Sequence, residues 1–229
     1  MSNLRSSLIG FGPRALVAAV LLGACAPPDA ELIEQRQSAY TSVAPNVRPS
    51  IHDFGPTARE DLANAILAFI TQPILDEHAN GHDWHQSTEL FFIRHHAYMN
   101  ELEAYLLDHG MFAYLPVPKW DPATPIPDEF MVFDSLVAPQ DPMNQTPDMH
   151  VEDAVNVDDL CSYRTATDLA AAVNGWHGSV HIAVGGAMGV VVTAPGAPIF
   201  WLWHGFLDDL YHTWQWKCGV FPALASVVL

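Results

Sequence analysis

The sequence predicts a mainly α-helical domain with one hydrophobic core and long irregular loops. Half of the 229 residues are apolar, which is enough for a packed interior. Apolar side chains recur at helical spacing in several segments. Eight of the 18 prolines lie between Pro116 and Pro147, where no periodic pattern is present. This stretch is therefore expected to be a long connection that wraps over the helices.

The first half of the domain contains two predicted helices. In the first, Thr57 can cap the N-terminus with Glu60 three residues later, and apolar residues repeat until the break before Pro73. The helix can resume after Pro73 as far as His78. A second helix is expected over residues 90–109, and Gly110 ends it.

The second half contains two more helical segments. Residues 167–173 are expected to form a short helix, and residues 200–216 a longer amphipathic one. Glycine and proline pairs between them indicate turns. The sequence shows no internal repeat and no glycine-rich phosphate loop.

The net charge of the chain makes nucleic acid a poor candidate partner. Nine Lys and Arg residues stand against 26 Asp and Glu residues, which gives a formal charge of -17. Such a field repels phosphate backbones.

The N-terminus is typical of an exported bacterial protein. Residues 1–24 contain an apolar run that is too short to span a bilayer but fits a signal peptide. The run ends in a motif, residues 22–25, that resembles a lipobox, so Cys25 would carry a lipid anchor. Ordinary cleavage near Ala24 or Ala26 is the alternative. Residues 25–50 are interpreted as a tether and 51–229 as the functional domain, in the periplasm or on the outer membrane.

Two further cysteines lie within the domain. An exported compartment permits a disulfide between Cys161 and Cys218. The sequence does not show whether the two residues meet.

Histidine is unusually abundant, with twelve residues of which eight fall in two groups. In the downstream group, His177 and His181 are four residues apart, so on a helix both would face one ion. His204 follows on an amphipathic segment and would complete a three-histidine site. Asp208 lies one helical turn later and could accept a hydrogen bond from a ligand imidazole.

The upstream group could form a second three-histidine site. His78, His82 and His85 lie in a polar region, and His95 lies on the apolar face of the helix 90–109. His96 is expected to face away from His95. The isolated residues His52, His109, His150 and His212 are interpreted as surface or hydrogen-bonded histidines.

Long motifs around both groups resemble those of the tyrosinase and catechol oxidase family. The stretches 177–188 and 194–215 are similar to the half of that family that binds the second copper ion. The stretches 89–103 and 115–122 resemble the helix of the first copper ion and the Trp-Asp segment after it. The resemblance covers residues 46–216.

The resemblance implies a four-helix bundle that holds two copper ions. It assigns His95 to the first ion and His177, His181 and His204 to the second. The position of a further ligand of the first ion is occupied here by Gln86. The adjacent His85 is therefore preferred, with His82 as the alternate, and His78 is preferred for the remaining ligand.

The same resemblance implies an oxidoreductase that uses O₂ to oxidise o-diphenols, and in some members to hydroxylate monophenols first. In the family, an Asn directly after the first ligand of the second copper is linked to activation of monophenols. This chain has Gly178 there, which favours diphenols. Phe206 is expected to lie over the substrate opening. A separate protein could deliver copper. The alternatives are a haemocyanin-like dioxygen carrier and a non-catalytic copper-binding protein of the cell surface.

Overall fold

A computed structural model describes residues 48–81, 85–137 and 141–220, which all belong to one compact unit. The predicted signal peptide, the lipidation site Cys25 and the alternate ligand His82 lie outside these residues. Residues 48–50, assigned to the tether from sequence, pack against the domain. Arg48 is only 2% exposed, and Ser50 forms an isolated bridge with Lys119. The domain therefore includes residues before Ile51.

The described residues are mainly helical, as predicted, and form no extended strand. Short 3₁₀ turns occupy parts of the connections. The α-helices are α2 (Pro56–Phe69), α3 (Gln72–Asn80), α4 (Leu90–Asp108), α5 (Ala166–Val184) and α6 (Pro198–Cys218).

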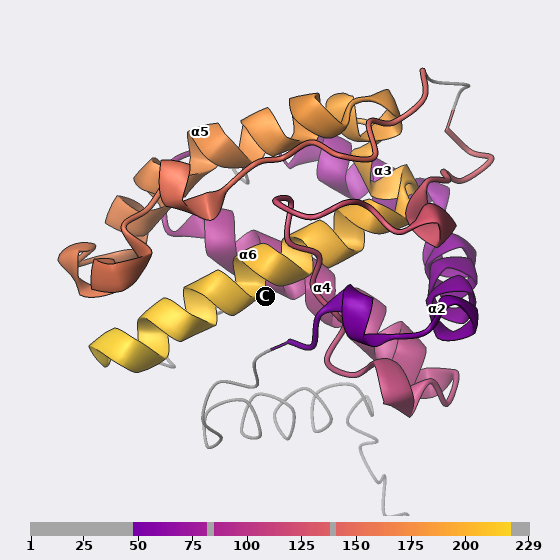
Figure 1. Cartoon of the computed structure of the whole chain (residues 1–229), viewed down its shortest axis with the longest axis horizontal. Helices are drawn as coiled ribbons and strands as arrows, with labels where there is room; N and C mark the ends of the chain where they lie inside the picture. Colours follow the sequence, from indigo (N-terminus) through magenta and orange to yellow (C-terminus); the bar gives the residue numbers. More distant parts are fainter. Residues whose placement is uncertain (1–47, 82–84, 138–140, 221–229) are drawn as a thin grey trace, which may run out of the picture. The chain divides into compact units, whose positions relative to one another are not determined.

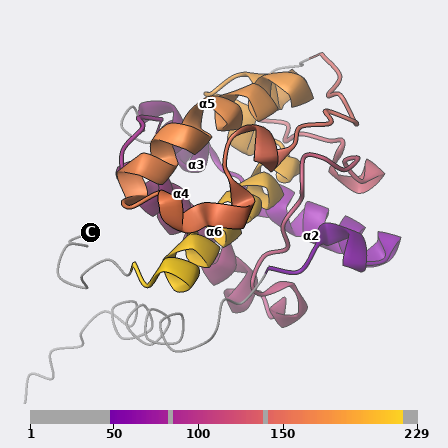
Figure 2. The same ribbon diagram turned by 60° about the vertical axis from the view of Figure 1, so that its left-hand side comes forward.

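Four of these helices, α2, α4, α5 and α6, form the bundle. Helix α6 packs against α2 and α4, and α4 also packs against α2 and α5. Helices α5 and α6 run in opposite directions (Figures 1 and 2). The large side chains Trp120, Trp201, Trp203 and Trp214 are fully buried in the core. The faces of α4, α5 and α6 that line this core also carry most of the clustered histidines.

The predicted cap of the first helix is wrong. Helix α2 begins at Pro56, Gly55 is its N-cap, and no side chain caps it. Proline is favourable at the first helical position because its missing N–H would have no partner there. Thr57 therefore lies inside the helix. The predicted interruption before Pro73 is confirmed, since α2 ends at Phe69 and α3 begins at Gln72.

Helix α5 is much longer than the short helix expected at residues 167–173. A capping box between Thr165 and Asp168 starts it, and it continues to Val184. Gly175 and Gly178 weaken the helical pattern in the sequence because glycine has low helix propensity. Burial of the face that includes Val173, Val180 and Val184 compensates for this. Consequently, His177 and His181 share one continuous helix.

A disulfide joins Cys161 to Cys218, with an S–S distance of 2.08 Å. It links the turn before α5 to the end of α6. Among the described helices, none combines the length and the apolar character that a membrane span requires.

Candidate metal centre

The upstream histidines preferred from sequence come together. His78 lies near the end of α3, His85 in the following loop, and His95 on the buried face of α4. One ring nitrogen from each lies within 4.8 Å of those of the other two.

The downstream histidines form a second group on α5 and α6. The Nε2 atom of His177 lies 3.1 Å from Nε2 of His181 and 3.3 Å from Nε2 of His204. The pair on α5 points from one helix face, as the four-residue spacing predicts. His204 approaches them from the antiparallel helix α6.

The two groups adjoin each other in the bundle core. The rings of His95 and His204 stack with centroids 4.6 Å apart. Ring nitrogens of His95, His177 and His204 also lie within 4.8 Å of one another. The six imidazoles thus form one continuous cluster with three residues from each half of the chain.

Backbone carbonyl groups orient four of the six rings. The Nδ1 atoms of His95 and His204 lie 2.6 and 2.7 Å from the carbonyl oxygens four residues earlier on their own helices. Nδ1 of His78 contacts the Val191 carbonyl at 2.9 Å, and Nδ1 of His181 the Met188 carbonyl at 3.0 Å. Since a carbonyl oxygen only accepts, each Nδ1 carries the proton and donates it. The lone pair of each ring is then on Nε2, which is the form that binds a metal ion.

This arrangement fits a cation among the downstream Nε2 atoms. His181 and His204 have their single protons on Nδ1, so their Nε2 atoms can only accept. His177 can donate at most one proton from its Nε2 atom, yet two such acceptors lie within 3.3 Å of it. One hydrogen bond cannot satisfy all three nitrogens, whereas a metal ion between them can.

Burial keeps the imidazoles neutral. Desolvation, together with repulsion from neighbouring imidazoles, lowers the pKa of His78 to about 2 and that of His95 to about 3. Desolvation lowers the pKa of His181 to about 4 and holds those of His177 and His204 well below the ordinary value. Neutral imidazole is the ligating species, so protons compete little with a metal here. A donor set of imidazoles without carboxylates suits copper.

Two of the six imidazoles are partly exposed. His78, His95, His177 and His204 are buried, whereas His85 and His181 are half-buried. Each group therefore has one ligand at the rim. Phe206 is also half-buried and lies against Trp176 and Trp203, and its role over the opening stays a prediction.

The residue after His177, Gly178, has open space around its Cα atom. A Cβ atom added at Gly178 would meet no atom within 4 Å. Helix α5 could therefore carry a side chain at this position.

The expected role of Asp208 needs correction. Its Oδ1 atom accepts a hydrogen bond from Nδ1 of His96 at 2.7 Å, and its Oδ2 atom binds Arg48. Burial alone would raise the pKa of Asp208, but His96 and Arg48 hold it well below its usual range. The carboxylate lies one turn along α6 from His204, and its hydrogen bonds go to His96 and Arg48. It orients the imidazole of His96, which belongs to another group of potential ligands than His95.

Two supporting residues were missed from sequence. Asn174 donates from Nδ2 to the His85 carbonyl at 2.8 Å and so ties the His85 loop to α5. Arg48 binds Asp208, Glu103 and the Val117 carbonyl, so it joins α4, α6 and the long connection. The only sequence signal for the role of Asn174 was its position one turn before His177. No sequence signal indicated the role of Arg48, an isolated Arg in the segment assigned to the tether.

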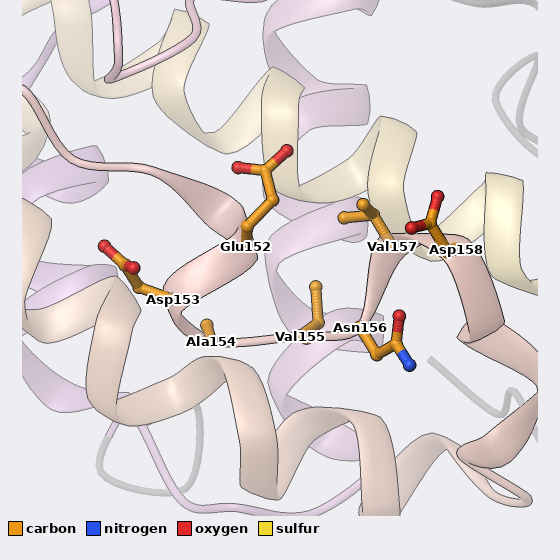
Figure 3. A pocket seen from close by; sticks show the side chains of 7 residues that line it. All are labelled: Glu152, Asp153, Ala154, Val155, Asn156, Val157 and Asp158. Carbon is orange, nitrogen blue, oxygen red and sulfur yellow. The ribbon is translucent and has the colours of Figure 1, made fainter.

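A surface pocket of about 380 Å³ lies elsewhere and contains none of these histidines. Its carboxylates, from Glu152, Asp153 and Asp158, do not converge on one point (Figure 3). The pocket therefore lacks the geometry of a cation site.

Two comparisons with known proteins agree with this geometry. Residues 135–217 match the family model described as the common central domain of tyrosinase. This range contains His177, His181 and His204. A tyrosinase of Streptomyces lincolnensis is 36% identical over 63 residues, which amount to 25% of this chain and 23% of that protein. The match thus spans about a quarter of the relative's length.

The matched range supplies the downstream histidine group, and the fold adds the upstream group against it. The family is one of copper-dependent oxidases. The sequence match and the histidine cluster together make this chain similar to the central domain of tyrosinases.

Proposed function

We propose that the protein binds two copper ions and uses O₂ to oxidise o-diphenols to o-quinones. His78, His85 and His95 would hold one ion, and His177, His181 and His204 the other. Bound copper would supply the one-electron redox chemistry and the O₂ binding that these side chains lack. Two diphenols give up four electrons and four protons, and one O₂ becomes two waters.

The convergence of six neutral imidazoles carries this proposal. The protein's own contribution is to fix the Nε2 atoms in place through the carbonyl groups bound at Nδ1. The buried residues around the cluster exclude water from most of it. The half-buried rim at His85 and His181 leaves access for a phenol. That access favours an oxidase over a dioxygen carrier, in which the same ligands would be shielded from substrates.

Diphenols are proposed as the main substrates because Gly178 occupies the position of the Asn that is linked to monophenol activity. Phe206 is proposed to contact the ring of the substrate near the opening. A copper-delivery partner would act before turnover.

The protein is proposed to be exported from the cytoplasm. The Cys161–Cys218 disulfide supports it, since such bonds persist in oxidising surroundings. A lipid at Cys25 would anchor the protein to a membrane. Mass spectrometry of the mature N-terminus tests both statements.

Catechol turnover by purified, copper-loaded protein tests the function. His177→Ala and His95→Ala each remove a proposed ligand and should abolish quinone formation while circular dichroism stays helical. His150→Asn is the matched control, because His150 is exposed and lies outside the cluster. A wild-type protein that binds copper but does not oxidise catechol would favour the carrier or storage alternatives.

A further inference from the structure

A second cluster of potential ligands lies between α4 and α6, apart from the six histidines. It consists of His96, Asp208 and His212, whose ligand atoms lie within 4.8 Å of one another. Asp208 is buried, whereas the side chains of His96 and His212 are 28% and 29% exposed. The cluster is therefore open to solvent on its histidine side.

Two of the three distances within this cluster match a tetrahedral metal site. Nε2 of His212 lies 3.4 Å from Oδ1 of Asp208 and 3.4 Å from Nδ1 of His96. Ligands bound to zinc at their usual bond lengths lie about 3.3–3.4 Å apart in a tetrahedron. The remaining edge, from His96 to Asp208, is 2.7 Å and holds a hydrogen bond. Opening that edge by about 0.6 Å would complete the geometry.

The surroundings already orient these donors. Nδ1 of His212 lies 3.0 Å from Oε1 of Gln215, to which it can donate, so Nε2 is left to face the cluster. Nε and Nη2 of Arg48 bind the other oxygen of Asp208, at 3.1 and 2.6 Å. Metal-ligating imidazoles and carboxylates are typically held by such outer hydrogen bonds.

We propose that His96, Asp208 and His212 bind a divalent transition-metal ion, zinc foremost, with water as the fourth ligand. Two imidazoles and a carboxylate are a usual donor set for zinc. The strongly negative chain attracts cations to the surface. An ion there would join α4 to α6, the two helices that also carry His95 and His204.

Zinc binding to wild-type protein and to two variants tests this site. The copper-loaded protein is dialysed against zinc, and zinc per chain is measured for wild type, His96→Gln and His212→Gln. The wild type should hold one zinc ion more than either variant. Each substitution should lower the affinity of this site for zinc by at least about 100-fold. His109→Gln serves as the control, since His109 is exposed and near the end of α4.

The readout is a difference between variants, so it does not depend on what the six-histidine cluster binds. Equal zinc content in wild type and both variants would overturn the proposal. Absence of zinc from the copper-loaded wild type would overturn it as well, whether or not the variants fold. Bound Co²⁺ with the visible spectrum of a tetrahedral site, lost in His212→Gln, would support it.

Discussion

The Nε2 atoms of His177 and His181 lie 3.1 Å apart on one face of α5. Nδ1 of His181 donates to the Met188 carbonyl, so its Nε2 presents a lone pair to its neighbour. Nε2 of His204 lies 3.3 Å from the same atom of His177, and one proton on His177 cannot satisfy both acceptors, so burial of these three imidazoles is costly without a cation. The three Nε2 atoms are the most direct structural sign that the bundle core is built for metal.

Acid should destabilise the metal-free protein below about pH 6.5. The folded-state pKa values of His78, His95 and His181 are lowered to about 2, 3 and 4, so the unfolded chain takes up protons first. Their neutral forms contribute stability that is fully present above the unfolded pKa and is lost as the pH falls toward those values. The free energy of unfolding should decrease by up to about 1.4 kcal/mol per pH unit for each histidine.

Urea unfolding at a series of pH values measures this effect. His181→Gln removes one titrating group and should make the dependence shallower. Unfolding free energy that stays constant between pH 7 and pH 5 would contradict the assigned neutral state.

Substitution of Asn174 should weaken copper binding in the upstream group. Asn174→Ala removes the hydrogen bond to the His85 carbonyl, so the loop is less well fixed. Loss of such an outer contact typically costs about 10- to 100-fold in metal affinity. Competition with a copper chelator measures the change. Asn144→Ala is the control, because Asn144 bonds the Ala183 carbonyl on the surface, and equal losses in both variants would refute the role of Asn174.

Substitution of Arg48 should destabilise the domain strongly. Arg48→Met leaves the buried carboxylate of Asp208 without its cation, at a cost of about 3–5 kcal/mol. Arg59→Met breaks a more exposed pair with Glu129 and should cost about 0–1 kcal/mol. Urea midpoints of the two variants test the contrast. Similar midpoints would mean that Arg48 does not hold the helices together.

Gly178→Asn should raise the ratio of monophenol to diphenol activity. Space is available at this helical position, and the substitution restores the residue linked to monophenol activity in the family. Initial rates on tyrosine and on a catechol give the ratio. Gly175→Asn is the matched control, because Gly175 lies on the same helix and is also unobstructed. An unchanged ratio in Gly178→Asn would remove the proposed basis for diphenol preference.

The sequence predicted the helical class and identified as candidate ligands the six histidines that the fold brings together. Spacing was sufficient for His177 and His181 because an i,i+4 pair is a local property of a helix. The choice of His85 needed a resemblance, since its position depends on a loop held by Asn174 from another segment. The partners of Asp208 could not be predicted, because Arg48 and His96 reach it across 160 and 112 residues of chain. The length of α5 was missed because tertiary burial overrides the low propensity of its glycines.

The most direct test of the central claim is the amount of Cu(I) bound per chain under anaerobic conditions, followed by an absorption spectrum after O₂ is admitted. Cu(I) prefers imidazole to carboxylate oxygen, so the group of His96, Asp208 and His212 should not add to the amount of bound Cu(I). The account predicts two copper ions per chain and a new, intense near-ultraviolet absorption that appears with O₂. One ion or none in folded protein offered excess Cu(I), with no change in the spectrum, would contradict it.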